Sequence, residues 1–452
     1  MANFLTNNPL TRFFRNVLGP AAIMAAGMIG AGAVSTRLLA GCWFGFTLLW
    51  VALYVIPMVI FTNDSASRLG IMSGHRGMMD MIKTEISPVL AWFIFIPTFL
   101  LNIVINISQM SVMVEASYGI TGVELPGGGV ITPGKIATVL ILTILTLLGS
   151  LSGGFKRLQK VMTYLLMLIL LCFIIVAVKG LLDPRTWPRL FNGLIPRIPD
   201  NVPVVGSDSV RGGFTQLMAI AGQALPAAVF LSFGYFTSNA EYTENDLKMN
   251  FRKSVLNFGI IWGLFSVVVT IAGVTALHDV YRGENGGLHF SQIVNVSEAG
   301  RVITPALPSS LDFLATRIFS LGLLVAAYTT MVSVTLLMVY FCLDIVGKDW
   351  RYREGNKPFR WLMASWIVIP AVLSPFWKLP ALYQAILSMA GNLVLAPLAV
   401  LIIIYFINKS EYMKRYTANT GRNVVLGITF LFSLVVVVYG IYKFLQQFGY
   451  IH

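Results

Sequence analysis

Long apolar stretches separated by short polar segments make up most of this chain. Each is long enough to cross the roughly 30 Å hydrocarbon core of a bilayer as a helix. Charged residues fall almost only between the stretches, which excludes one large soluble core. The pattern therefore predicts an all-α membrane protein, embedded in a lipid bilayer, with about eleven transmembrane helices. We place them at about 19–40, 43–67, 87–110, 135–151, 157–180, 213–239, 252–277, 308–341, 359–376, 380–407 and 423–446.

Two of these stretches contain residues that interrupt helices. The first holds the glycine-rich segment 27–33, and the sixth holds Pro226. Proline removes a backbone donor and clashes with the preceding turn. Because the two stretches lie five apart, they predict an inverted five-plus-five repeat with a substrate site near the membrane midplane. A glycine packing face combined with a proline kink is the alternative interpretation.

The domain organisation follows from the same pattern. We expect a single transmembrane domain over 1–452, with a first repeat at 19–180, a second at 213–407 and a separate last helix at 423–446. The longer connections, about 181–212 and 278–307, contain Pro, Gly and Asn rather than a second domain.

The net charge of +13 does not indicate a nucleic-acid partner. The basic residues are scattered through short loops, for example at 156–160 and 348–360, as is typical of cytoplasmic loops. We therefore expect a bacterial inner membrane location, with the N-terminus in the cytoplasm and the C-terminus outside. The start of the chain has no cleavable signal peptide pattern. The three cysteines have no metal-ligand spacing and indicate small core residues.

Short segments in a fixed order give the chain a family resemblance. They are LGPAAIMAAGMIGAGAVSTRLLAGCWFGFTLLW, SRLGIMSG, GGFKRLQK, GLIPRIP and LYQAILS. In this order the chain resembles the NRAMP family of divalent-metal transporters over nearly its whole length. The resemblance implies a LeuT-type fold, that is, a five-plus-five inverted repeat with broken helices 1 and 6.

The chain departs from the family where the resemblance implies metal ligands. Gly30 stands for the family's metal-binding Asp and Ala33 for its Asn. Of a Met-Pro-His motif only Pro226 is kept, between Leu225 and Ala227. Three further family residues are replaced. Ser232 stands where the family has a later histidine, and Arg37 where it has an acid after the first motif. Asn106 stands where the family has an acidic residue linked to proton passage, and Asn102 lies one turn earlier.

The chemistry of these positions favours an anion. A divalent cation needs anionic or soft ligands to replace its hydration shell. The candidates here are backbone carbonyls near Met28 and Ala224 and the neutral side chains of Gln223 and Ser232, which are neither anionic nor soft. The half-helices that begin near Gly32 and Ala227 would present free N–H groups, which bind anions. The expected substrate-binding residues are Gly30, Ala31, Gly32, Ala33, Gln223, Ala224, Leu225, Pro226, Ala227, Ala228 and Ser232.

Five further residues are candidates for access or coupling: Ser35, Thr36, Arg37, Asn102 and Asn106. Each has a structural alternative. The two hydroxyls could bond to their own helix, the guanidinium could extend to the outer interface, and the two amides could bond between helices. Glu115 indicates a solvated helix end, and Phe230 and Tyr235 are candidates to shape the pocket.

The main functional expectation is a secondary transporter of a small inorganic anion. Bicarbonate is the favoured substrate, because a metal-site-lacking branch related to NRAMP is associated with its uptake, and protons are a candidate coupling ion. The alternatives are a divalent-metal carrier (Mn²⁺, Mg²⁺ or Fe²⁺) with a rebuilt site and a non-transporting sensor or scaffold. No catalytic motif indicates an enzyme, and we expect neither a cofactor nor a resident metal. The sequence sets no oligomeric state.

Overall fold

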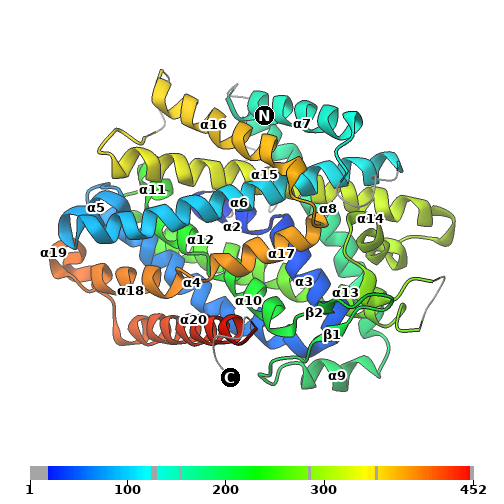
Figure 1. Cartoon of the computed structure of the whole chain (residues 1–452). Coiled ribbons are helices and arrows are strands. Elements are labelled where there is room, and N and C mark those ends of the chain that lie inside the picture. Colours follow the sequence, from blue (N-terminus) through cyan, green and yellow to red (C-terminus); the bar gives the residue numbers. More distant parts are fainter. Residues whose placement is uncertain (1–18, 124–129, 152–154, 284–286, 352–354, 448–452) are drawn as a thin grey trace, which may run out of the picture.

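The computed structural model describes residues 19–123, 130–151, 155–283, 287–351 and 355–447. Helices dominate it, and they lie side by side in one bundle (Figure 1). Within the described residues, eight helices are long and apolar enough to cross a membrane, or up to ten if two bent pairs are counted as one span each. This confirms an all-α membrane protein.

The first half of the chain supplies the first five expected stretches. The first stretch is split into two helices, and its second part runs on through a 3₁₀ turn into the next helix. The elements are α2 (Pro20–Met28), α3 (Ala31–Phe44), α4 (Leu49–Met72), α5 (Met78–Glu85), α6 (Pro88–Thr121), α7 (Pro133–Leu151), α8 (Phe155–Leu181) and α9 (Thr186–Asn192).

The second half begins after a two-stranded antiparallel sheet, β1 (Val202–Pro203) and β2 (Val210–Arg211). Its sixth stretch is also split in two. The elements are α10 (Gly213–Ala224), α11 (Ala227–Asn239), α12 (Leu247–Ser254), the π-helical segment η3 (Val255–Trp262), α13 (Gly263–Gly273), α14 (Val296–Ala299), α15 (Ala315–Ile345), α16 (Lys357–Leu373), α17 (Ala381–Asn392), α18 (Ala396–Ile407), α19 (Ser410–Met413) and α20 (Thr420–Gln447).

Both predicted helix breaks are present. The first separates α2 from α3 at Gly30, whose backbone is extended (φ −85°, ψ −175°). The second separates α10 from α11 at Pro226 (φ −75°, ψ 118°). Since each break leaves one helix end on either side, two C-termini and two N-termini meet in the middle of the bundle. Both helices are thus interrupted in their backbone, and the alternative of a glycine packing face with a proline kink is wrong.

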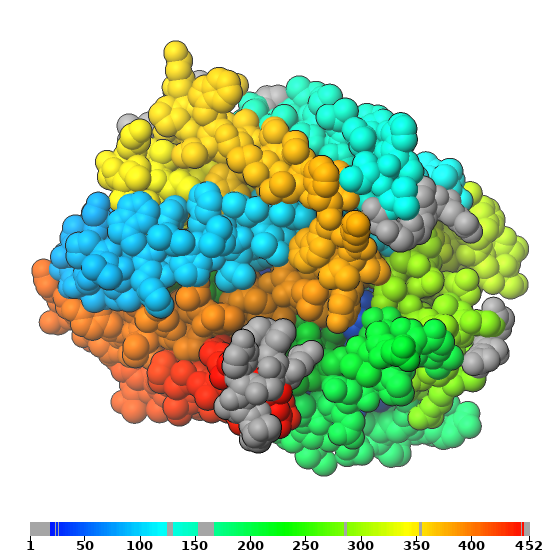
Figure 2. Space-filling model, in the orientation of Figure 1, coloured from blue at the N-terminus to red at the C-terminus, as the bar shows by residue number. Residues whose placement is uncertain are grey.

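The broken helices lie at the centre of the molecule. Every residue of α3 is buried, and α2–α4, which are dark blue in Figure 2, are almost hidden on the face shown there. Helix α3 packs on α13 and α17, while α10 packs on α17 and α11 on α4. The closest approach needs glycine, because a Cβ at Gly70 of α4 would lie 2.4 Å from the Cα of Gly234 in α11.

Some expected boundaries are wrong. Helix α6 continues to Thr121, well past the expected end at 110, and packs along α15 for much of its length (Figure 1). The tenth stretch is bent by 43° between α17 and α18. The proposed repeat limits, 19–180 and 213–407, stay a prediction.

Candidate functional site

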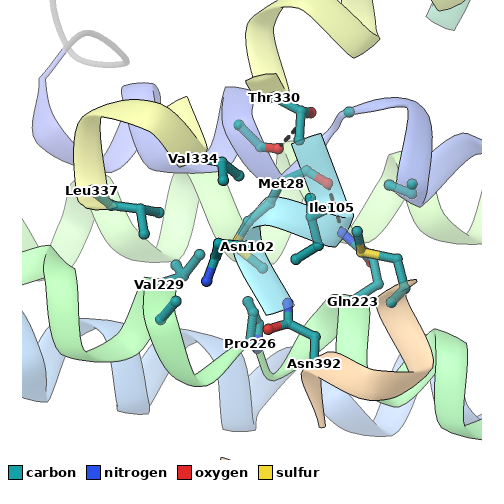
Figure 3. Close-up of a pocket in the computed structure, with 16 residues that line it drawn as sticks. Met28, Asn102, Ile105, Gln223, Pro226, Val229, Thr330, Val334, Leu337 and Asn392 are labelled. Atoms are coloured by element: carbon teal, nitrogen blue, oxygen red, sulfur yellow. Dashed lines mark hydrogen bonds between the residues drawn. The ribbon is translucent and has the colours of Figure 1, made fainter. Parts of the chain in front are cut away.

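A small cavity lies where the two broken helices meet (Figure 3). Its volume is about 50 Å³, which is room for one or two water-sized groups. Seven of the sixteen predicted residues line it: Gly30, Gly32, Ala33, Asn102, Gln223, Pro226 and Ala228. Ala31, Ala224, Leu225, Ala227 and Ser232 are buried beside it without lining it.

Gln223 presents an oxygen atom to the cavity. Its Nε2 donates to the carbonyl oxygen of Met28 at 2.6 Å, while its Oε1 is buried and has no partner. A carbonyl oxygen only accepts hydrogen bonds, so the amide cannot be turned around without losing this bond. The free atom of this side chain is therefore an acceptor.

Asn102 and Thr330 resemble Gln223, because the donor of each side chain is already bonded to a main-chain carbonyl. The Nδ2 of Asn102 donates to the carbonyl of Thr98 at 2.7 Å, which leaves Oδ1 as the other amide atom. The hydroxyl of Thr330 donates to the carbonyl of Gly27 at 3.0 Å, so its lone pairs remain. With Gln223, these side chains approach the cavity from three different helices (Figure 3).

Helix α17 contributes two residues that sequence reasoning missed, Met389 and Asn392. The thioether of Met389 lies over the start of α3, because a Cβ at Gly32 would meet its Sδ at 3.0 Å. Both residues were visible in the segment LYQAILSMAGN, three positions apart and hence on one helix face. Thr330 was missed as well, because no pattern marks it within its apolar stretch.

The glycine at position 30 has a steric cause. A Cβ built on Gly30 would lie 1.5 Å from the Oγ1 of Thr330. Thr330 of α15 therefore occupies the space where the side chain of an aspartate at position 30 would begin. An aspartate at position 30 and a threonine at position 330 therefore exclude each other sterically.

The helix ends around the cavity carry partial charges of both signs. Helices α3 and α11 begin there, and neither N-terminus has a side-chain cap. Helices α2 and α10 end there, with Gly27, Met28 and Gln223 among the lining residues. C-terminal carbonyls carry a negative partial charge and N-terminal amides a positive one. The expected positive field of α3 and α11 is therefore opposed by the negative ends of α2 and α10.

The remaining hydroxyl and amide candidates follow their structural alternatives. Ser35 donates to the carbonyl of Ala31 at 2.7 Å, and Thr36 donates to that of Ala33 at 3.2 Å. Ser232 bonds in the same way to Val229. Asn106 joins helices, since its Nδ2 donates to Thr335 Oγ1 and to the carbonyl of Trp366. None of these four side chains faces the cavity.

Arg37 does not follow its structural alternative, and its role in access or coupling stays a prediction. It does not extend to the membrane interface, since it is fully buried. Its guanidinium lies 5.3 Å from the ring centroid of Trp262 and donates one hydrogen bond, to Thr36. The Nε and Nη2 atoms have no partner, and the residue does not line the cavity.

Two acidic residues at opposite ends of the bundle are buried rather than solvated. Glu115 of α6, expected at a solvated helix end, is 7% exposed, and Asp344 of α15 is 5% exposed. Tyr235, expected to shape the pocket, instead donates its hydroxyl to Asp344. Among the residues that the structure describes, no group of three or more His, Cys, Asp or Glu could hold a metal ion.

A family model described as natural resistance-associated macrophage protein-like matches residues 21–443. The chain belongs to the Nramp family. Among the family's curated members, a divalent metal cation transporter MntH of Yersinia pestis is 24% identical over 334 residues, 73% of each chain. A natural resistance-associated macrophage protein 2 homolog of Dictyostelium discoideum is 22% identical over 444 residues, covering 96% of this chain and 64% of its own.

Solved structures agree on the fold. A mutant form of a manganese transporter of Eremococcus coleocola superposes with a TM-score of 0.69 at 16% identity, over 95% of this chain and 87% of its own. MhsT in complex with L-phenylalanine has a TM-score of 0.61 at 15% identity, over 93% and 97%. This Nramp protein is thus an integral membrane transporter with the LeuT-type fold, and broken helices 1 and 6 are confirmed.

Proposed function

We propose that this Nramp protein carries a divalent metal cation through the cavity between α2/α3 and α10/α11. The observation that carries the proposal is the orientation of the Gln223 amide. Its donor is held by the Met28 carbonyl, so its free oxygen is available to a cation. Asn102 supports the same reading, and the curated relatives are named as divalent metal cation transporters.

The ligands available differ from carboxylates in strength. Amide, hydroxyl and main-chain oxygens with the thioether of Met389 are neutral donors, and hard divalent cations bind more weakly as the ligand charge falls. We therefore expect a dissociation constant on the order of a millimolar. The cavity is also too small for a fully hydrated ion, so part of the hydration shell must be replaced.

A small anion such as bicarbonate is the second candidate. One observation favours it: the first turns of α3 and α11 face the cavity without side-chain caps, and no acidic side chain is among the cavity's lining residues. The same lining contains no lysine, arginine or histidine to balance an anion. The opposing C-termini of α2 and α10 further weaken this alternative.

Asn392→Asp separates the two candidates. Asn392 lines the cavity, and a carboxylate there strengthens divalent cation binding while repelling an anion. We expect Mn²⁺ or Mg²⁺ uptake into proteoliposomes to reach half-saturation at a concentration about tenfold lower. The matched control is Asn408→Asp, the same change at an exposed position after α18.

The opposite result identifies the anion candidate. Labelled bicarbonate uptake by the unaltered protein, lost in Asn392→Asp and kept in Asn408→Asp, together with no metal uptake, refutes the proposal. A pH-sensitive dye in the same vesicles shows whether protons move together with the transported ion.

A further inference from the structure

Glu115 fastens three segments of the chain together. Its Oε1 accepts a hydrogen bond from the backbone N–H of Val296 at 2.6 Å, and its Oε2 accepts one from the N–H of Ala381 at 3.1 Å. Val296 is the first residue of α14 and Ala381 the first residue of α17. First-turn N–H groups have no partner within their own helix. One buried carboxylate of α6 therefore satisfies two helix starts at once.

The two helices it joins have different roles. Helix α14 is part of the connection between α13 and α15, at one end of the bundle. Helix α17 leads from the same end to the cavity, which its residues Met389 and Asn392 line. The carboxylate thus connects a peripheral segment to a helix of the site, about two turns of α17 away from the cavity.

The opposite end of the bundle repeats this construction. Asp344, in the last turn of α15, accepts a hydrogen bond from the N–H of Asp80 in the first turn of α5 at 3.0 Å. It also accepts the hydroxyl of Tyr235 from α11. Helix α5 connects α4 to α6 as α14 connects α13 to α15. In an inverted repeat α6 corresponds to α15, so the two carboxylates take equivalent places at opposite faces.

We propose that Glu115 is a proton-binding latch: ionised, it holds α14 and α17 against α6, and on taking up a proton from the solvent at that face it releases them and opens the path to the cavity. One O–H bond forms, and the carboxylate loses its negative charge. A neutral carboxyl group accepts the two N–H groups less strongly, because hydrogen bonds to a charged acceptor are roughly twice as strong as neutral ones.

The charged surroundings of Glu115 oppose one another. Lys135 of α7 carries a positive charge near it, and Glu298 of α14 carries a negative one. Glu298 is itself held by the N–H of Val294. Helix α17 also carries Tyr383, and the first turn of α15 carries Arg317. Since no arginine or lysine forms an ion pair with Glu115 among the described residues, its charge depends on the two amides and on the nearby solvent.

Hydrogen exchange of the whole protein in lipid nanodiscs tests the latch. The peptides to follow are those around 293–300 and 380–386, with rates corrected for the intrinsic effect of pH. Between about pH 7.5 and about pH 5 we expect protection of both segments to fall at least tenfold, the size of one hydrogen bond to a charged acceptor. The peptide of α5 reports whether the carboxylate at the opposite face responds to pH in the same way.

Two variants isolate the carboxylate. Glu115→Gln, which keeps the shape and removes the charge, should have low protection in both segments at every pH. Val296→Pro removes one donor at the first helical position, where proline is tolerated, and should release α14 while leaving Ala381 bound. The matched control, Asp344→Asn, should loosen α5 and leave α14 and α17 unchanged.

The outcomes are decisive without any knowledge of the cargo. Protection of α14 and α17 that is independent of pH in the unaltered protein, and unchanged in Glu115→Gln, overturns the latch. If Glu115→Gln does not fold, the titration of the unaltered protein and Val296→Pro still decide. Because exchange is measured without a transported ion, its result does not depend on the proposed function. The latch can be wrong while the proposed function is right, and the latch can be right while the proposed function is wrong.

Discussion

Gly30 and Thr330 share one space between α3 and α15, so Gly30 cannot take a side chain while Thr330 is present. Gly30→Asp places its Cβ 1.5 Å from the threonine hydroxyl oxygen, and overpacking of this kind costs about 1 to 3 kcal/mol or more. We expect the single variant to be poorly folded by size-exclusion chromatography. Gly30→Asp combined with Thr330→Gly removes the clash and should restore a folded protein.

The double variant also carries a carboxylate at the cavity. Divalent cation uptake by it should therefore saturate at a lower concentration than in the unaltered protein, by about tenfold. A double variant that is as poorly folded as Gly30→Asp alone contradicts the explanation of the glycine.

Met389 supplies a soft donor to the cavity, which Met28 also lines. A thioether favours softer metal ions, whereas oxygen ligands suit Mg²⁺ and Ca²⁺. Met389→Leu keeps the volume and removes the sulfur, so it should reduce Cd²⁺ uptake about tenfold relative to Mg²⁺ uptake. Competition uptake assays measure this ratio. Met363→Leu, a buried methionine of α16 outside the cavity, is the control, and equal effects of the two changes contradict a ligand role.

At the scale of the elements, the last helix is tied to the bundle by a buried charge cluster. Asp64 of α4 is fully buried. It accepts from Arg68 and from Arg422 of α20, each at 2.7 Å, and from Asn250 of α12 at 3.3 Å. Asp64→Ala removes the carboxylate that balances both arginines, and we expect it to cost about 3 to 5 kcal/mol. Thermal unfolding in detergent measures the loss.

Arg422→Ala is the matched comparison, because Arg68 still balances Asp64 after this change. Its effect on the unfolding midpoint should be the smaller of the two. Limited proteolysis at the loop before α20 should increase in both variants. If Arg422→Ala destabilises the protein as much as Asp64→Ala, the cluster acts through the α20 contact alone.

The sequence was informative where lipid and backbone chemistry leave little choice. Apolar length fixes where helices cross a bilayer, and Gly30 and Pro226 mark the breaks because few other residues suit them. The polar end of α6 was expected to be a solvated helix end, since the segment after 110 is not apolar enough to require lipid, but Glu115 lies buried there. Contacts such as Glu115 with Ala381 join positions 266 apart, and no local pattern reports them.

The substrate site shows the same limit. Missing ligands at Gly30 and Ala33 were visible in the sequence and pointed to an anion. The direction in which Gln223 presents its amide depends on the Met28 carbonyl across the break, and this contact exists only in the folded chain. Met389 and Asn392 were equally readable as ordinary helix residues. The cation proposed above therefore depends on a contact that the sequence does not show.

For the molecule as a whole, a cavity lined only by uncharged side chains has an electrical consequence. The empty site carries no charge of its own, whereas the site loaded with a divalent ion, the cargo proposed above, carries two across the membrane. A membrane potential acts on such a step with about 2.3 kcal/mol per charge for each 100 mV, hence about 4.6 kcal/mol for this cargo. Voltage alone could then sustain a gradient of more than about a thousandfold. It acts on the loaded step here, whereas in a carrier whose carboxylates neutralise the ion it acts on the empty return step.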